Sequence, residues 1–244
     1  MIPHLDPGAL AWLVLAAAVG GAVQGSIGFG FALVVVPALS LVDSEALPAT
    51  ALILVAPLTV TMAIRERAHI DRPGFLSIAA GRVLGTALGA TLLVAVPPGS
   101  ISVLLGGMIV VAVALSVIGL DVAPTPPVAF GAGFLSGVTG TTSAVGGPAL
   151  AVVYQRRPGP ELRSTLALTF VVGLVMSLVA VGAVGRLRAW HGILALEMLP
   201  GLLVGLWSSR HLARALDGGW LRPVLLAFAG AAGVYITIRG ILGG

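Results

Sequence analysis

Two glycine-rich stretches, at residues 25–30 and 137–147, each interrupt a long apolar run of this chain. Such an interruption is typical of a bent or broken helix, because glycine weakens a helix and adopts backbone conformations that other residues avoid. The helix that begins after a break directs unpaired backbone N–H groups and a partial positive charge toward it. Both stretches therefore have the chemistry to bind a small anion.

Polar side chains add hydrogen-bond donors to both stretches. Hydroxyl and amide groups bind oxyanions without a fixed charge that would hold the anion too tightly for release. The candidate binding residues are Gln24, Gly25, Ser26, Gly28, Gly30, Ser136, Gly137, Thr139, Gly140, Thr141, Thr142 and Ser143. The same small residues would also serve close helix packing in a membrane. Because the two breaks occupy matching places, a transporter binding site is the favoured interpretation.

Arg82 is the only arginine that lies well inside an apolar segment. Ten residues beyond Arg72, it would lie up to about 15 Å deep along a helix. Its charge would attract an anion, or its long side chain would reach back to the cytoplasmic headgroups, and the sequence does not distinguish the two. Two interpretations of Glu197 are open: a carboxylate that couples transport to a proton, and a carboxylate at the membrane interface. The second is favoured.

The elements that carry these residues are membrane helices. The 244 residues are 58% hydrophobic and 9% charged, with a mean hydropathy of +1.10, so too few polar side chains exist to cover a water-soluble globule. All 13 basic residues are arginine and sit singly or in small groups between apolar stretches, as topology signals do. We expect a multi-pass protein of the cell (inner or plasma) membrane, surrounded by lipid and without a nucleic-acid partner.

Several chemistries are excluded by composition. The absence of cysteine removes disulfides, thiolate metal sites and cysteine nucleophiles, and the absence of lysine removes the usual ATP-binding loop. The four histidines lie in or near loops without ligand spacing, so we expect no metal site. A serine protease using Ser136 or Ser143 would need a histidine at the same depth. We therefore expect no cofactor and no enzymatic activity.

Eight apolar segments follow one another, most of them near the about 17 to 25 residues that a membrane helix needs. They cover residues 9–42, 47–64, 75–96, 101–120, 128–154, 165–184, 192–209 and 221–242. The sequence thus predicts an all-α polytopic membrane protein of about eight hydrophobic segments, of which the first and fifth are broken or re-entrant.

The two halves of the chain resemble each other. Residues 81–119 align with residues 201–239 without a gap and keep a Gly-x-x-x-Gly pair in register, and the two glycine-rich stretches match as well. We predict two pseudosymmetric repeats of four segments, residues 1–120 and 121–244, joined by a stiff linker over residues 121–127.

Arginine placement indicates how the repeats are oriented. If the first and fifth segments each cross the membrane once, the loop arginines divide six against six between the two faces. If each segment instead returns to its own face as a helical hairpin, loops 65–74, 155–164 and 210–222 share one face and the division is nine against three. Positive charge concentrates on the cytoplasmic face, so we favour hairpins, outside termini and an inverted second repeat.

Gly81, Gly85 and Gly89, at four-residue spacing, predict a helix-packing face. Such faces would allow a homodimer and would equally serve packing within one chain.

The paired glycine motifs resemble those of the sulfite exporter TauE/SafE family of membrane transporters. Residues 24–37 match a first motif of Gly-x-x-Gly-x-Gly running to a proline, residues 136–148 resemble a second that ends in Gly-Gly-Pro, and residues 69–72 are similar to a family loop. The resemblance implies a secondary transporter that exports a small sulfur-containing oxyanion, such as sulfite or the organosulfonate sulfoacetate. A proton is a possible coupling partner, with Glu197 as its candidate carboxylate.

The chain departs from the family pattern at several positions. Phe31 replaces a glycine, Thr141 and Thr142 interrupt a glycine run, and Arg82 occupies a position expected to be apolar. The substrate could differ accordingly. An anion channel and a membrane protein without transport activity remain alternative interpretations.

Overall fold

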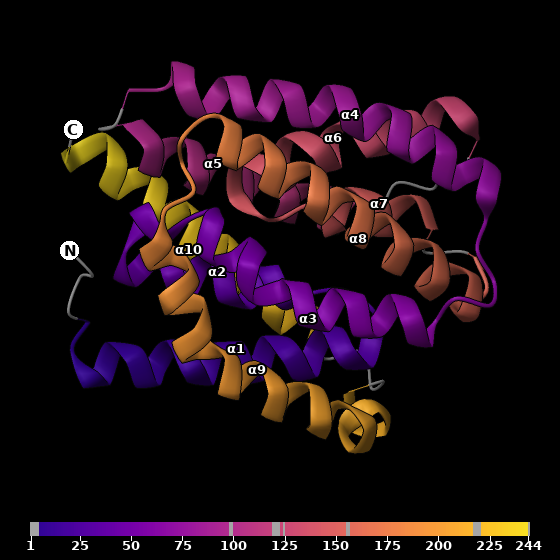
Figure 1. The fold of residues 1–244 in the computed structure, drawn as a ribbon, viewed down its shortest axis with the longest axis horizontal. Coiled ribbons are helices and arrows are strands. Elements are labelled where there is room, and N and C mark those ends of the chain that lie inside the picture. Colours follow the sequence, from indigo (N-terminus) through magenta and orange to yellow (C-terminus); the bar gives the residue numbers. More distant parts are fainter. Residues whose placement is uncertain are drawn as a thin grey trace.

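The computed structural model describes residues 5–97, 100–118, 123, 125–154, 157–216 and 221–243. In these ranges the chain is all-helical, as predicted (Figure 1). The helices are α1 (Pro7–Ile27), α2 (Phe31–Val42), the 3₁₀ helix η1 (Ser44–Ala46), α3 (Ala49–Arg65), α4 (Arg72–Ala95), α5 (Ile101–Ile118), α6 (Pro126–Ser143), α7 (Gly147–Tyr154), α8 (Gly159–Ala183), α9 (Ala189–Leu216) and α10 (Leu221–Gly243). Of the predicted linker, residues 121, 122 and 124 lie outside the described residues, and residues 126 and 127 already belong to α6.

Six of the described helices are long and apolar enough to cross a membrane, namely α1, α4, α5, α8, α9 and α10. Helices α2 and α3 are shorter and apolar. The predicted first segment corresponds to α1 with α2, and the predicted fifth corresponds to α6 with α7. The chain is a multi-pass membrane protein.

Both interrupted segments fold back on themselves. Gly20 on α1 faces α2 so closely that an added Cβ would lie 3.0 Å from Cγ2 of Val35. On α6, the hydroxyl of Ser136 donates to the carbonyl of Gly146 over 2.7 Å, although α6 continues for seven more residues before it ends. The contact of Gly20 with Val35 shows that α1 and α2 pack as a helical hairpin, and the bond from Ser136 to Gly146 shows that the chain also turns back at the second break.

The two breaks are shorter than the glycine-rich stretches suggested. The first covers residues 28–30, where Gly28 and Gly30 have φ of 94° and 114°, so Gly25 and Ser26 still belong to α1. The second covers residues 144–146 and begins at Ala144 with φ of 62°. Residues 137–143 remain helical, and the hydroxyls of Thr139, Thr142 and Ser143 donate to carbonyls of the same helix.

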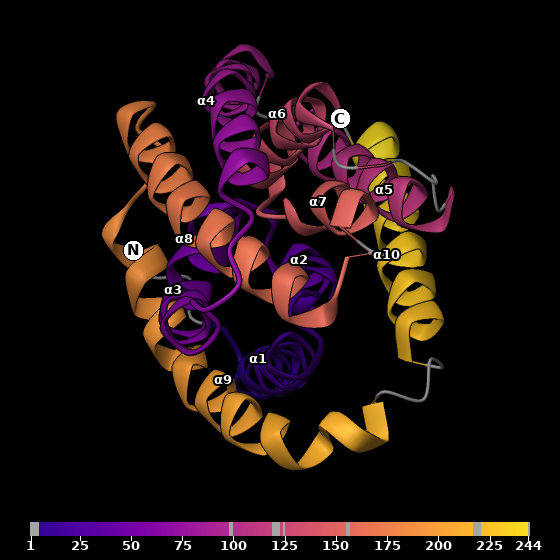
Figure 2. The same ribbon diagram turned by 90° about the vertical axis from the view of Figure 1, so that its right-hand side faces the viewer.

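Helices α2 and α7 lie inside the bundle, enclosed by the longer helices (Figure 2). Nine of the twelve residues of α2 and seven of the eight residues of α7 are buried. A half-helix surrounded by protein is the arrangement in which a bilayer tolerates an interrupted backbone, since its free polar groups do not meet lipid.

The predicted glycine face of α4 is confirmed as a packing face. Added Cβ atoms on Gly81 and Gly85 would overlap the carbonyl oxygens of Phe130 and Phe134 on α6. Gly205 meets the carbonyl of Ala18 in the same way, where α9 packs on α1. These faces are therefore occupied by helices of the same chain.

The loops between α3 and α4 and between α7 and α8 lie at one end of the molecule. Arg163 pairs with Glu66 at 3.2 Å, and the backbone N–H groups of His69 and Asp71 donate to the hydroxyls of Ser164 and Thr165. Helix α1 begins and α10 ends at the opposite end (Figure 1). Arg156 and the side chains of Arg210, Arg214 and Arg222 lie outside the described residues.

Candidate functional site

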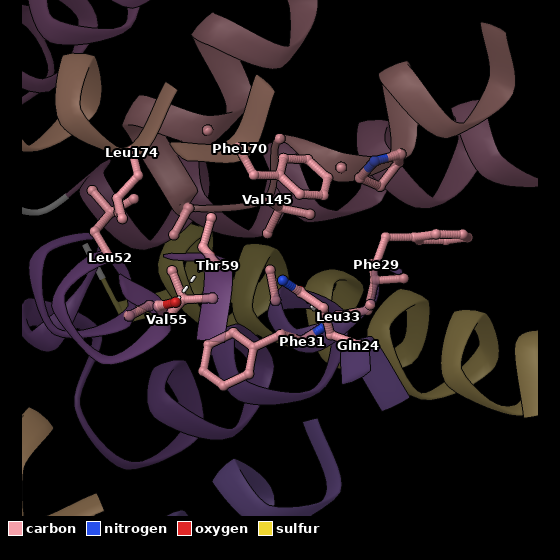
Figure 3. Close-up of a pocket in the computed structure, with 18 of the residues that line it drawn as sticks. Gln24, Phe29, Phe31, Leu33, Leu52, Val55, Thr59, Val145, Phe170 and Leu174 are labelled. Atoms are coloured by element: carbon pink, nitrogen blue, oxygen red, sulfur yellow. Dashed lines mark hydrogen bonds between the residues drawn. The ribbon is translucent and has the colours of Figure 1, made fainter. Parts of the chain in front are cut away.

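A cavity of about 60 Å³ lies where the two chain breaks meet (Figure 3). Phe29 and Gly30 line it from the first break, and Ala144, Val145 and Gly146 line it from the second. Its volume is several times the about 10–15 Å³ that one water molecule requires. The structure thus brings both breaks to one space that is large enough for a small solute.

Arg82 places a positive charge at this cavity. It extends from α4, is only 4% exposed and donates from Nη1 to the hydroxyl of Ser136 over 2.7 Å. No carboxylate of the described residues pairs with it, and its Nε is buried without a hydrogen-bond partner. The side chain points into the protein interior and not toward headgroups. A buried charge is costly unless it is compensated, so this environment favours an anion.

Gln24 is the second polar group of the site. Its Oε1 accepts the N–H of Phe31 over 3.2 Å, which satisfies one of the free donors at the start of α2. The side chain is 5% exposed and lines the cavity. Among the described residues no partner is found for its amide nitrogen, which leaves two N–H donors for a ligand.

The remaining walls are mostly apolar. Figure 3 shows Gln24 and Phe31 on one side of the cavity and Val145 and Phe170 on the other. The hydroxyl of Thr59 also lines the space, but it donates to the carbonyl of Val55 on its own helix over 2.9 Å. Low polarity strengthens the attraction between Arg82 and an anion, because the effective dielectric constant is lower than in water.

Comparison with known families decides the class of protein. The family described as Sulfite exporter TauE/SafE matches residues 13–236. This chain belongs to the sulfite exporter TauE/SafE family. Neither the curated proteins nor the solved structures contain a match. The resemblance seen in the glycine motifs is confirmed, and the family is one of membrane transporters of sulfite-type anions.

In this TauE/SafE protein, four of the predicted site residues line the cavity: Gln24, Gly30, Arg82 and Gly140. Ser136 reaches it indirectly, through its bond to Arg82. Gly28 belongs to the first break, but an added Cβ there would be 3.3 Å from the side chain of Arg163.

The other candidates face neighbouring helices. The hydroxyl of Ser26 donates to the carbonyls of Ala22 and Ser209, and Gly25 packs against Ser209. Gly137 meets the α4 backbone at Arg82. Thr139, Thr142 and Ser143 donate to carbonyls of α6 itself, while Thr141 bonds to Ser177 over 2.9 Å. The hydroxyls of Ser26, Thr139, Thr141, Thr142 and Ser143 thus all have partners within the protein.

Sequence reasoning did not identify the contribution of α3 and α8. Leu52 and Val55 on α3, and Phe170 and Leu174 on α8, complete the cavity wall. Apolar residues occupy most positions of both helices, so the sequence does not indicate which of them face a cavity. Phe29 and Val145 lie within the breaks, and their position beside the motif glycines was the available signal.

Proposed function

We propose that this TauE/SafE protein is a secondary transporter that exports a small sulfur-containing oxyanion, such as sulfite or sulfoacetate, across the cell membrane. The observation that carries the proposal is the buried guanidinium of Arg82, which has no carboxylate partner among the described residues and lines the cavity between the two breaks. The apolar walls and the two amide donors of Gln24 fit a small anion that must also be released.

Matching helix contacts support an inverted repeat of residues 1–120 and 121–244. Helix α1 packs on α9 as α6 packs on α4, α2 contacts α10 as α7 contacts α5, and α3 contacts α9 as α8 contacts α4. Each interrupted hairpin is therefore held by helices of the other half. In transporters of this plan, the halves rock against each other around a fixed site.

The loops between α3 and α4 and between α7 and α8 form the arginine-rich end of the molecule. The ion pairs at this end fit a closed state of such a transport cycle. Glu66 of the first half bonds to Arg163 of the second at 3.2 Å, and Arg65 joins the same carboxylate at 3.1 Å. Arg65 also donates to the carbonyl of Gly25 over 3.2 Å, close to the first break. We infer that this cluster must separate when the site opens toward the arginine-rich, cytoplasmic face.

The residues of this site favour the membrane potential over a coupled proton as the driving force of export. An inside-negative potential expels an anion with about 2.3 kcal/mol per charge per 100 mV. None of the described residues that line the cavity is Asp, Glu or His, and Glu197 is exposed on α9. A coupled proton would therefore need a site away from the anion.

The test is transport by purified protein in liposomes under an imposed inside-negative potential. We expect saturable efflux of sulfite or sulfoacetate with counterflow, lost in Arg82→Ala and in Gly140→Leu, whose new side chain would meet Nη2 of Arg82. Gly107→Ala is the control, because nothing lies within 4 Å of its added Cβ. Wild-type flux in the two site variants would contradict the site. Flux without saturation or counterflow would indicate a channel. The absence of flux for every anion tested would indicate a protein without transport activity.

A further inference from the structure

The connection between α8 and α9 lies at the end of the molecule where α1 begins and α10 ends, opposite the arginine-rich end (Figure 1). His191, in the first turn of α9 and only 3% exposed, contacts the carbonyl oxygen of Glu45 through Nε2 over 3.2 Å. Since a carbonyl oxygen only accepts, Nε2 carries the hydrogen and donates, and Nδ1 accepts the N–H of Arg188 over 3.0 Å. His191 thus joins the second half of the chain to η1 of the first half.

Arg186 makes a second contact between the halves at this end. Its Nη2 donates to the carbonyl of Leu93, in the last turn of α4, over 3.0 Å. The residue four positions after Leu93 is Pro97, which has no N–H, so this carbonyl has no helical partner. The guanidinium supplies the missing donor. The α8–α9 connection is therefore fastened to both η1 and α4 of the first half.

These two bonds lie at a space that is not closely packed. A cavity of about 330 Å³ is lined by Glu45 and Ile101 of the first half and by Arg186, Arg188 and His191 of the second. Close-packed contacts resist separation, whereas a contact that spans a cavity through hydrogen bonds separates at a lower cost. The halves can therefore part at this end.

An equivalent bond exists at the opposite end of the molecule. The alignment that matches Gly81 with Gly201 places Asp71 opposite His191. The carboxylate of Asp71, just before α4, accepts the hydroxyl of Tyr154 over 2.8 Å, and Tyr154 is the last residue of α7. Matching positions at the starts of α4 and α9 thus each bond to the other half near the end of its interrupted segment. Halves that rock around one site must release such bonds at one end at a time.

We propose that residues 186–191 form a latch, held by His191 and Arg186, that closes the outer end of the transporter and releases when the anion leaves. This inference rests on the proposed function and adds the control of access to the same cavity. The outer end is the one opposite the arginine-rich, cytoplasmic face. Release of the latch opens the cavity outward while the Glu66–Arg163 pair keeps the other end closed.

The latch is tested by access of a charged, membrane-impermeant maleimide to the cavity from outside intact cells. The chain has no cysteine, so one cysteine in place of Leu174 in the cavity wall reports access. His191→Asn keeps an acceptor for the N–H of Arg188, but its side chain is too short to reach Glu45. Loss of one hydrogen bond shifts an equilibrium by about twofold to tenfold, so we expect labelling to accelerate by that factor in His191→Asn and in Arg186→Gln. The double variant should exceed either.

Three comparisons separate a latch from a general loosening of the fold. Inverted membrane vesicles expose the cytoplasmic side, and labelling there should not accelerate in either variant. Tyr154→Phe removes the equivalent bond at the other end and should not accelerate labelling from outside. His69→Asn, at an exposed histidine of the arginine-rich end, should label like the parent. Equal acceleration from both sides, or unchanged labelling from outside in both latch variants, would overturn the proposal.

The labelling experiment needs no substrate, so failure of this inference and failure of the proposed function are distinguishable. Anion flux in liposomes together with labelling that does not depend on the latch would overturn the latch alone. Side-specific labelling without flux of any anion would overturn the transport function and leave the latch in place. His191→Gln, whose longer amide still reaches the carbonyl of Glu45, should label more slowly than His191→Asn, and equal rates would contradict the bond as the cause.

Discussion

The hydroxyl of Ser136 connects the cavity's positive charge to the second chain break: it accepts from Nη1 of Arg82 and donates to the carbonyl of Gly146, both over 2.7 Å. Ser136→Ala would leave both of these buried groups without a partner. We expect a loss of about 1–3 kcal/mol in the free energy of unfolding, together with reduced anion flux. Chemical unfolding in detergent and liposome efflux measure the two effects.

Ser143→Ala is the comparison for Ser136→Ala, because Ser143 is equally buried on the same helix. Its hydroxyl donates to the carbonyl of Thr139 one turn earlier, a bond that supports no second element. We expect a smaller loss in the free energy of unfolding than for Ser136→Ala, because the carbonyl of Thr139 keeps its backbone partner, and near-normal flux. Loss of flux in Ser143→Ala would instead favour the direct binding role predicted for the hydroxyl-rich stretch.

Replacing Arg82 by methionine should stabilise the protein while it abolishes function. A well-packed apolar residue that replaces a buried charge is neutral or stabilising by about 1–4 kcal/mol, and Arg82 has no carboxylate partner among the described residues. Thermal unfolding should show a higher Tm for Arg82→Met and no further rise with sulfite. A lower Tm would mean that the charge is already compensated in the empty protein.

Most of the correct predictions from the sequence came from the spacing of its glycines. Glycines at residues 28 and 30 adopt positive φ, a conformation that few other residues tolerate, so the first break was recognisable from residue types. The second break was placed too broadly because its left-handed residue is Ala144, which carries no such signal. The hydroxyls of Thr139, Thr142 and Ser143 suggested ligand donors, and in the structure each donates to a carbonyl of its own helix.

Positions determined by tertiary packing were not predictable from the sequence. The sequence left two roles open for Arg82, binding an anion or reaching the headgroups, because its depth along a helix does not reveal which side it faces. Phe170 and Leu174 gave no signal, since one more phenylalanine or leucine in an apolar helix has no distinguishing pattern. Their role follows only from the contact of α8 with α4, which joins residues far apart in the chain.

Alanine at the glycine contacts between helices should destabilise the protein. Gly85→Ala would place a methyl group against the carbonyl of Phe134, so the α4–α6 pair must separate. We expect a cost of about 1–3 kcal/mol from this overpacking, measured as a lower Tm. Gly107→Ala should be neutral or stabilising by up to about 1 kcal/mol, because alanine favours the helix and nothing lies within 4 Å. Equal Tm values for the two variants would contradict the packing contact.

The Glu66–Arg163 pair should control opening at the arginine-rich end. Glu66→Gln removes one charge of a partly exposed pair that is worth about 1 kcal/mol or less, so opening should increase by up to about fivefold. The chain has no cysteine, so one cysteine introduced in place of Leu174 in the cavity wall reports access of a charged maleimide. We expect faster labelling in Glu66→Gln, and faster labelling of the parent protein as salt rises.

Glu161→Gln provides the matched control for that experiment. Glu161 pairs with Arg157 at 3.5 Å at the same end of the molecule, but both residues belong to the second half, so the pair does not hold the halves together. Its loss should leave the labelling rate of the cavity cysteine unchanged. If Glu66→Gln and Glu161→Gln label at the same rate as the parent, the Glu66–Arg163 pair is an ordinary surface contact. The closed end must then depend on the backbone bonds from His69 and Asp71 to Ser164 and Thr165.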